Sequence, residues 1–157
     1  MTCVLAPAIR KIVSGAQTGV DRAALNVAIR WGIPCGGWCP RGRFAEDGII
    51  SRAYPLKETP NAKYEERTEW NVRDSDGTLL ICHGLPIGGT AFTLGMCRKH
   101  EKPFLLLDLS SGYKLASVEE WLAVHRIETL NVAGPRESSW PGIGEETERI
   151  LEAVLLG

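Results

Sequence analysis

The stretch RKIVSGAQTGVDRAALNVAIRWG, residues 10–32, joins a short apolar run to an amphipathic segment through a glycine-rich turn. Residues 10–15 are typical of a strand that ends in a tight turn. The apolar residues after the turn recur at helical spacing and share one face: Val20, Ala23, Ala24, Val27, Ala28 and Trp31. Thr18 followed by Asp21 resembles a capping box, so we expect a helix that begins near Thr18 and Gly19 and stops at Gly32.

The rest of the chain continues this alternation of apolar and amphipathic segments. Strands are predicted at 78–84, 102–109 and 130–134, and helices near 62–72, over 91–96, from a capping pattern at 117–120 and over 144–156. Strands that are apolar throughout and alternate with helices are typical of a parallel sheet covered on both faces. We therefore predict one α/β domain over residues 1–157, a three-layer sandwich with a mostly parallel sheet flanked by helices.

Residues 36–76 fit this alternation least well. They are rich in Gly, Pro, Arg and Glu, and only a short strand around 36–39 and the helix near 62–72 stand out. A segment of this length without clear periodicity is more often functional or lid-like than idle. A contact between subunits is the alternative.

The composition is that of an ordinary globular protein, since 44% of the 157 residues are apolar and 24% are charged. Eighteen basic and nineteen acidic side chains give a net charge of −1, which removes the bulk attraction on which general nucleic-acid and anionic-membrane binders rely. Every apolar run is shorter than the roughly 18 residues of a membrane span. Residues 3–9 lack the charge order of a signal peptide. We expect a cytoplasmic protein that binds neither nucleic acid nor membranes.

The five cysteines, at positions 3, 35, 39, 82 and 97, are an odd number in a chain long enough to build its own core. We therefore expect reduced thiols. Cys35 and Cys39 form a spaced pair, but no second pair supplies the two further ligands of a tetrahedral metal site. No metal site is predicted.

Three glycine-containing loops follow predicted strands: SGAQTGVD at 14–21, IGGT at 87–90 and AGPRES at 133–138. Ligands of open parallel sheets bind beyond the carboxyl ends of the strands, so we expect these loops to meet at one site. Glycine permits close approach of the backbone, and the first amides of a helix attract phosphate. The candidate binding residues in the loops are Gly15, Gln17, Thr18, Gly19, Gly88, Gly89, Thr90, Gly134, Arg136 and Ser138. Each loop alone fits an ordinary tight turn, but the three together predict an anion cradle.

Arg41, Arg43 and Asp108 are further candidates for the same ligand, beside Arg136. Arg41 and Arg43 flank Gly42 in a charge-dense turn that could close over a bound anion, or could equally be a solvated loop. Arg136 could grip a phosphate with two N–H groups. Asp108 ends a predicted strand and is a candidate for holding a ligand hydroxyl or an arginine. The first loop has neither a Walker A motif nor GxGxxG, so ATP hydrolysis and ordinary NAD chemistry are not expected.

Residues suited to catalysis are few. His83 follows Cys82 directly on a strand, where neighbouring side chains point to opposite faces, so these two cannot act as a pair. Asp74 and Asp76 could share a face as a general base or a ribose contact. Turn chemistry explains the sequence Asp-Ser-Asp-Gly nearly as well.

Six segments carry the pattern of a known family: SGAQTGVDRAAL (14–25), CPRGRFAEDG (39–48), YEERTEWNVRDSDGTLLI (64–81), GGTAFT (88–93), KPFLLLDL (102–109) and LNVAGPRES (130–138). Together, and in this order, they resemble the molybdenum cofactor carrier family. The resemblance implies a Rossmann-like fold related to the lysine-decarboxylase-like phosphoribohydrolases, the LOG superfamily, which bind nucleotides or nucleotide-derived ligands. It also implies molybdenum cofactor (molybdopterin), a phosphate-bearing molecule, as the ligand, and a homo-oligomer, a dimer or tetramer.

The phosphoribohydrolase relatives carry a PGGxGTxxE motif whose glutamate acts with an arginine at the glycosidic bond. In this sequence GGT stands at 88–90, but Thr93 takes the position of the glutamate and no acid directly follows it. An acid for that reaction would have to come from elsewhere, and Glu46, Asp47 and Asp76 are the candidates.

The sequence therefore predicts a binding protein, a carrier or sensor of a phosphate-containing small molecule such as molybdenum cofactor or a nucleotide derivative. The enzymatic alternative is a nucleotide N-glycosidase or phosphohydrolase. A third interpretation is a scaffold whose loops contact another protein.

Overall fold

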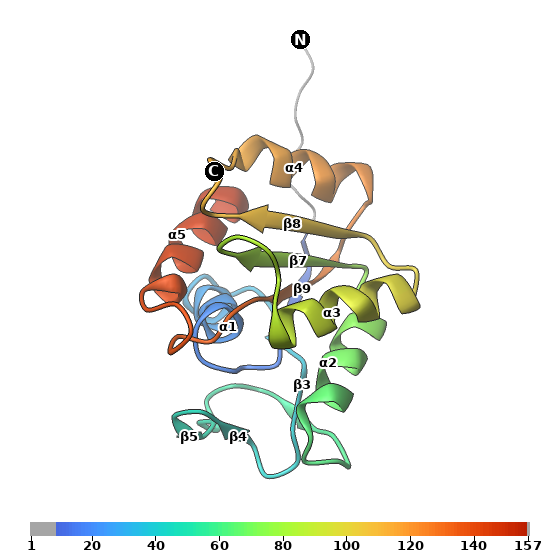
Figure 1. The fold of residues 1–157 in the computed structure, drawn as a ribbon, viewed down its shortest axis with the longest axis vertical. Helices are drawn as coiled ribbons and strands as arrows, with labels where there is room; N and C mark the ends of the chain where they lie inside the picture. Colours follow the sequence, from blue (N-terminus) through green and yellow to red (C-terminus); the bar gives the residue numbers. More distant parts are fainter. Residues whose placement is uncertain (1–8, 157) are drawn as a thin grey trace.

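The computed structural model describes residues 9–156 and contains a sheet of five parallel strands between two layers of helices (Figure 1). The strands of this sheet are β1 (Lys11–Val13), β2 (Cys35–Gly36), β7 (Gly77–Cys82), β8 (Phe104–Asp108) and β9 (Thr129–Ala133). The helices are α1 (Val20–Arg30), α2 (Tyr64–Arg73), α3 (Gly88–Lys99), α4 (Leu115–Val124) and α5 (Ile143–Leu156). The predicted three-layer α/β sandwich is thereby confirmed.

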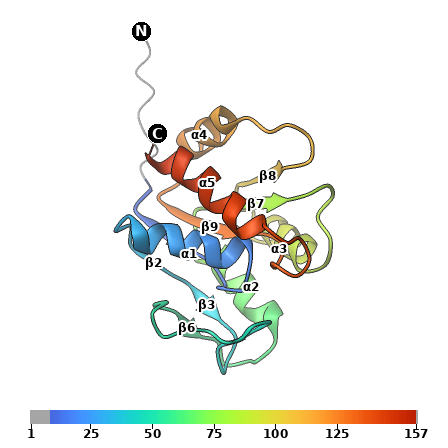
Figure 2. The ribbon, with the colours of Figure 1, turned by 90° about the vertical axis from the view of Figure 1, so that its left-hand side faces the viewer.

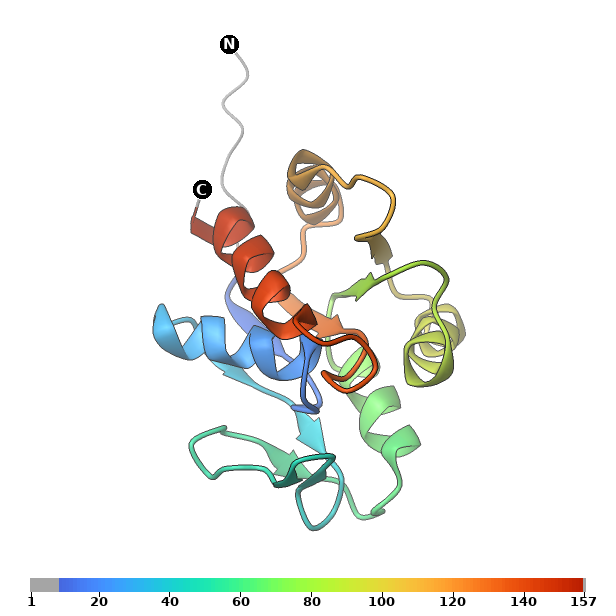
Figure 3. The ribbon, with the colours of Figure 1, turned by 60° about the vertical axis from the view of Figure 1, so that its left-hand side comes forward.

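The helices divide unequally between the two faces of the sheet. On one face α5 packs between α1 and α4, while α2 and α3 contact each other on the opposite face (Figures 2 and 3). The core under the three-helix layer is apolar, and its fully buried side chains include Ile12, Leu79, Leu122, Leu130, Ile143 and Leu151. The opposite face of the central strands is more polar, because Asn131 and Thr78 are buried there and hydrogen-bond to each other at 3.2 Å.

The order of the strands differs from their order in the chain. The sheet runs β2-β1-β9-β7-β8, so the last strand of the sequence lies in the middle. Counted from β7 through β8 and β9 and then on to β1 and β2, the order becomes the 2-1-3-4-5 of a flavodoxin-like doubly wound sheet. In that fold the connections reverse direction between the first strand and the third, which here are β7 and β9. A ligand crevice is expected beyond their carboxyl ends.

The first helix starts where expected, near Thr18 and Gly19, but the side-chain caps expected at Thr18 and at 117–120 need correction. Gly19, with φ of 81°, is the N-cap of α1 and no side chain caps this helix. The hydroxyl of Thr18 instead donates to the carboxylate of Glu46 and accepts the amide of Glu137 at 3.1 Å. Helix α4 begins before Ser117, at Leu115, also without a side-chain cap. Both predicted caps were wrong. Thr18 bonds to Glu46, which is distant in the sequence, and Ser117 lies inside the first turn of α4.

Most of the predicted apolar stripe of α1 is confirmed, since Val20, Ala23, Ala24, Val27 and Ala28 are buried. Its last member, Trp31, is the C-cap residue and is half exposed. The stripe therefore ends one turn earlier than the sequence spacing indicated.

Residues 36–61 form two small strand pairs beside the main sheet. β3 (Trp38–Cys39) pairs with β6 (Lys57–Glu58), and β4 (Phe44–Ala45) pairs with β5 (Gly48–Ile49). A second apolar cluster, formed by Ala16, Leu25, Cys39 and Ile50, joins this segment to α1. The expected strand at 36–39 is in fact the end of β2 followed by β3.

Two remaining expectations concern cysteines and membranes. Cys35, Cys39, Cys82 and Cys97 are free thiols, and Cys3 lies outside the described residues. Over residues 9–156 no helix is both long and apolar enough to cross a membrane.

Gly134, directly after β9, is predicted to be essential for packing. A Cβ atom on this residue would lie 2.2 Å from the carbonyl oxygen of Ile81 and 2.6 Å from a methyl group of Val20. We expect Gly134→Ala to lower the free energy of unfolding by about 2 kcal/mol or more, measured by denaturant unfolding. Gly95→Ala is the matched control, because its Cβ would meet no atom within 4 Å and alanine is favoured inside a helix. Equal stability of the two variants would contradict the packing argument.

Candidate functional site

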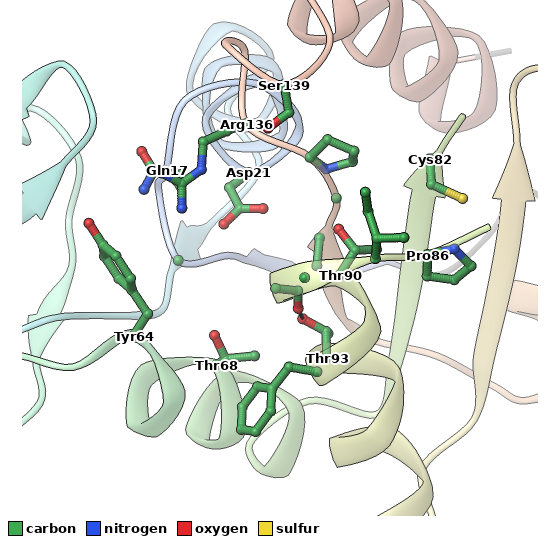
Figure 4. Close-up of a pocket in the computed structure, with 18 of the residues that line it drawn as sticks. Gln17, Asp21, Tyr64, Thr68, Cys82, Pro86, Thr90, Thr93, Arg136 and Ser139 are labelled. Atoms are coloured by element: carbon green, nitrogen blue, oxygen red, sulfur yellow. Dashed lines mark hydrogen bonds between the residues drawn. The ribbon is translucent and has the colours of Figure 1, made fainter. Parts of the chain in front are cut away.

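A cavity of about 610 Å³ lies at the carboxyl ends of β7 and β9 (Figure 4). Its volume is within the range of small-molecule sites. Its walls come from the loops after β1, β7 and β9 and from α1, α2 and α3, and include Gly15, Gln17, Asp21, Tyr64, Arg67, His83, Gly88, Gly89, Thr90, Asn131, Gly134, Arg136 and Trp140. The position of the cavity agrees with the crevice expected where the strand order reverses.

The start of α3 forms one wall of the cavity. Gly88 and Gly89 are the first residues of the helix, and the preceding Ile87 supplies no side-chain cap. A Cβ atom on Gly89 would meet nothing within 4 Å, so the space in front of the helix is open. The amides of an uncapped helix N-terminus and the helix dipole favour an anion. This wall is therefore suited to a phosphate group.

Arg136 and Arg67 approach the cavity from opposite elements and share the ring of Tyr64. The guanidinium of Arg136, in the loop after β9, lies 5.9 Å from the ring centre and is exposed. The guanidinium of Arg67, from α2, lies 5.1 Å from the same ring and is buried. Arg136 is therefore accessible to a ligand, whereas Arg67 belongs to the wall.

Arg67 occupies the space beside Gly15, where a Cβ atom would stand only 2.1 Å from its Nη1. Nη1 donates to the carbonyl oxygen of Gly15 at 2.7 Å and lies 3.9 Å from Oδ2 of Asp21. Burial raises the pKa of Asp21 to about 6, because lost hydration outweighs the attraction of Arg67 and of the amides of Gly134 and Gln17. Burial also lowers the pKa of Arg67, but the guanidinium stays charged at neutral pH.

Gln17 contributes a buried amide to the cavity wall. Its Oε1 accepts the backbone amides of Thr18 at 3.1 Å and of Glu46 at 2.9 Å. Its Nε2 is buried and has no acceptor among residues 9–156. Among residues 9–156, Nε2 of Gln17 and Nε2 of His83 are the buried side-chain nitrogens of the cavity lining that have no hydrogen-bond partner.

The cavity thus brings together seven of the predicted binding residues, and the other six do not line it. Gly15, Gln17, Gly88, Gly89, Thr90, Gly134 and Arg136 line the cavity. Thr18 and Ser138 both bond to the carboxylate of Glu46, which joins the start of α1 to the loop after β9. Gly19 has no room for a side chain, because a Cβ would lie 2.4 Å from the carbonyl oxygen of Pro135.

Three predicted charged residues also lie outside the cavity lining. Arg43 is buried and donates to the carbonyl groups of Ile50, Ser51 and Tyr54, so it holds residues 43–54 together. The side chain of Arg41 is exposed. Asp108 accepts the hydroxyl and amide of Ser110 and the amide of Gly84, which lowers its pKa to about 2. Its carboxylate fixes the loop after β7.

The carboxylates proposed for a hydrolytic reaction do not line the cavity. Glu46 is bonded to Thr18 and Ser138, and Asp47 is paired with Arg22. Asp76 accepts the amides of Glu128 and Thr129 at the amino end of β9, away from the site. The acids that do line the cavity are Asp21 and Glu65.

Sequence reasoning missed several residues of the walls. Arg67, Tyr64 and Asn71 belong to α2, in the segment without clear periodicity, and Trp140 follows the predicted loop. The ring of His83 stacks on Trp140, with centroids 3.9 Å apart and planes inclined by 17°. The sequence does show Gly15 and a set of polar residues on one face of α2. That these belong to one site becomes evident only when the structure places Gly15 beside α2. In the described part of the chain no cluster of three or more His, Cys, Asp or Glu side chains could hold a metal ion.

Comparison with known proteins agrees with this architecture. A family model described as the circularly permutated YpsA SLOG family matches residues 12–155. A crystal structure from Syntrophus aciditrophicus SB, described as "Putative molybdenum carrier protein", is 47% identical, covers 96% of this chain with 97% of its own and has a TM-score of 0.93. No curated protein matches the chain.

The fold and the cavity define a doubly wound α/β protein of the ligand-binding kind. Because the family model spans nearly the whole chain, the chain belongs to the circularly permutated YpsA SLOG family. The description as circularly permutated fits the strand order. The flavodoxin-like order 2-1-3-4-5 starts at β7, whereas β1 and β2 precede β7 in this chain. The family assignment made from the six sequence segments is confirmed.

The raised pKa of Asp21 predicts a pH-dependent stability. The pKa is 3.8 for the ordinary group and about 6 in the folded protein, so the folded state binds the proton more tightly. The stability that this tighter proton binding contributes is fully present below about pH 4 and is lost as the pH rises through about 6. At about 1.4 kcal/mol per pKa unit, the buried charge costs up to about 3 kcal/mol at neutral pH.

Asp21→Asn carries no charge and should therefore exceed the wild type in free energy of unfolding above about pH 6. The difference should shrink steadily towards about pH 4, as the wild-type carboxyl takes up its proton. Denaturant unfolding of both proteins across this pH range provides the test. A difference that does not change with pH would show that Asp21 does not titrate as described.

Proposed function

We propose that this protein binds a phosphate-bearing small molecule in the cavity at β7 and β9, as a carrier or sensor. The observation that carries the proposal is the open, uncapped start of α3 at Gly88 and Gly89, which faces the same cavity as the exposed guanidinium of Arg136. Helix amides and a guanidinium are both suited to phosphate oxygens. Thr90 and Gly134 complete this part of the predicted cradle.

Molybdenum cofactor or a nucleotide derivative is the ligand that we propose. The residues fit such a molecule, because the same cavity offers α3 for a phosphate, aromatic side chains such as Tyr64 for a flat ring, and polar groups such as Gln17 and Asp21 for the ring edge. The description of the Syntrophus protein as a molybdenum carrier supports the first of these ligands. Molybdenum would then be cargo, held by the pterin.

The remaining predicted contacts act indirectly in this proposal. Thr18, Gly19 and Ser138 fix the loops that carry Gln17 and Arg136, and Asp108 fixes the loop that leads to α3. Arg41 and Arg43 belong to the charge-dense turn next to these loops.

We further propose a cytoplasmic homo-oligomer, a dimer or tetramer, whose subunit number light scattering would give. Leu85 and Ile87, which are 85% and 80% exposed, are the apolar side chains most available for a contact.

A nucleotide N-glycosidase or phosphohydrolase is the second candidate function. It is favoured only by the buried Asp21, a carboxyl in the cavity whose pKa is raised to about 6 by loss of hydration. Release of free base or inorganic phosphate from a panel of nucleotides, abolished in Asp21→Asn, would establish turnover. If no small anion raised the melting temperature, the scaffold interpretation would replace both.

The direct experiment is mass spectrometry and elemental analysis of the molecule that remains bound after rapid purification from a host that makes molybdenum cofactor. A pterin with stoichiometric molybdenum would establish the carrier function. A nucleotide, or a phosphate compound without molybdenum, would assign the cavity to nucleotide derivatives.

Arg136→Ala is expected to weaken binding of the purified ligand at least tenfold without unfolding the protein. The guanidinium is exposed and contacts the ring of Tyr64, so its loss removes a charge from the cavity but little packing. Affinity is measured by calorimetry, and folding by the melting temperature. Arg149→Ala on the exposed side of α5 is the matched control, expected to bind normally. Unchanged affinity in Arg136→Ala would remove this residue from the site.

Gly89→Val tests the start of α3 separately. Its side chain would meet no atom of the protein within 4 Å of the Cβ, so the variant should fold. The side chain would stand in front of the helix amides, where it would exclude a phosphate group, and we expect at least tenfold weaker binding. Normal affinity in this variant would place the phosphate elsewhere in the cavity.

A further inference from the structure

The amide of Gln17 has a fixed orientation. Two backbone N–H groups, of Thr18 and Glu46, point at the same atom of this amide, and only the oxygen can accept both. The nitrogen is therefore turned away from these loops. Gln17 is 5% exposed, and its Nε2 has no acceptor among residues 9–156. A buried donor held in place without a partner is an unmet requirement for an acceptor.

Asp21 presents the opposite requirement in the same cavity. Figure 4 shows its carboxylate directed into the cavity, and an ionised carboxylate only accepts hydrogen bonds. Arg67 stands 3.9 Å away, beyond hydrogen-bond distance, and its Nη1 donates instead to Gly15. The carboxyl accepts the backbone amides of Gly134 and Gln17, and its remaining lone pairs are free for a ligand. Gln17 and Asp21 both line this stretch of the cavity wall.

We propose that this stretch of wall recognises an amino-lactam edge, in which a ring carbonyl, a ring N–H and an exocyclic amino group stand next to one another. The carbonyl accepts from Nε2 of Gln17, and the N–H and amino groups donate to the carboxylate of Asp21. Pterins and guanine carry this edge, and adenine does not. Gln17 and Asp21 are thus specificity residues for the ring.

The proposal rests on the proposed function, because it assumes a ligand whose phosphate lies at the start of α3. It adds the class of ring at the other part of the same cavity. The neighbouring side chains are consistent with a ring, since Tyr64 offers an aromatic face that is 38% exposed. Desolvated polar partners of this kind discriminate strongly, because a ligand that lacks the matching groups leaves them unpaired.

The test is calorimetric titration of the full chain with GMP, IMP, XMP, AMP and hydroxymethylpterin phosphate. We expect GMP and the pterin phosphate to bind at least tenfold more tightly than AMP, and IMP, which lacks the amino group, to lie between. The relative affinities of GMP and the pterin phosphate identify which source of the edge the site prefers. Equal affinity for GMP and AMP would overturn this inference but leave the proposed function standing. If none of the five bound, both would be overturned.

Two variants give a readout that a structural role alone would not produce. Asp21→Asn offers an N–H in place of a carboxylate oxygen, so its preference should move at least tenfold from GMP towards XMP, which has a carbonyl where guanine has the amino group. Gln17→Glu replaces the donor by an acceptor, and should weaken GMP at least tenfold more than AMP. Arg149→Ala should keep the wild-type order. An unaltered GMP preference in Gln17→Glu would contradict the proposal even if Asp21→Asn failed to fold.

Discussion

A buried guanidinium joins the parts of the molecule that form the site. Arg67 enters from α2 into the space that a side chain on Gly15 would fill, donates to the Gly15 carbonyl at 2.7 Å and lies 3.9 Å from Asp21 of α1. Burial disfavours the charged form of both partners, as the direction of their pKa changes shows. Removing the guanidinium would take away the counter-charge of the buried Asp21 and the donor to the Gly15 carbonyl, so the loop after β1, α1 and α2 are joined through Arg67. Arg67 thus ties three elements of the cavity wall together.

The topology of the sheet explains why the cavity lies where it does. Parallel strands bring their following loops to one edge, and the reversal of the strand order between β7 and β9 opens a crevice there. Because β1 pairs with β9 in parallel, the loops that follow these two strands become neighbours. Residues as far apart as Gln17 and Arg136 therefore line one cavity.

The two parts of the cavity are suited to different parts of a ligand. The start of α3 offers backbone amides and open space, which bind phosphate without regard to the rest of the molecule. Gln17 and Asp21 offer a buried donor and a buried acceptor, which depend on the chemistry of a ring edge. In the function that we propose, the helix terminus would supply affinity and the two polar side chains would supply selectivity.

Some features failed to emerge from the sequence for reasons that individual residues make clear. Asp21 completes a Thr-x-x-Asp pattern, which predicts a solvent-facing cap, but Thr18 bonds to Glu46 instead and Asp21 is buried. Arg67 lies on a charged, weakly amphipathic helix, where an arginine is ordinarily exposed. Its burial depends on Gly15, 52 residues earlier in the chain. Arg43 was expected to contact an anion, whereas the structure shows it bonded to three carbonyl groups of its own segment.

The sequence by itself determined the α/β class, the main strands and helices, and the three glycine-containing loops, because apolar runs, helical periodicity and glycine positions are local properties. Only the tertiary structure decided the strand order, the burial of Asp21 and Arg67, and the fact that Nε2 of Gln17 has no acceptor among residues 9–156. These features arise from contacts between segments distant in the chain. Whether a polar side chain is buried, and what remains for it to bond, is fixed by the neighbours that the fold brings to it.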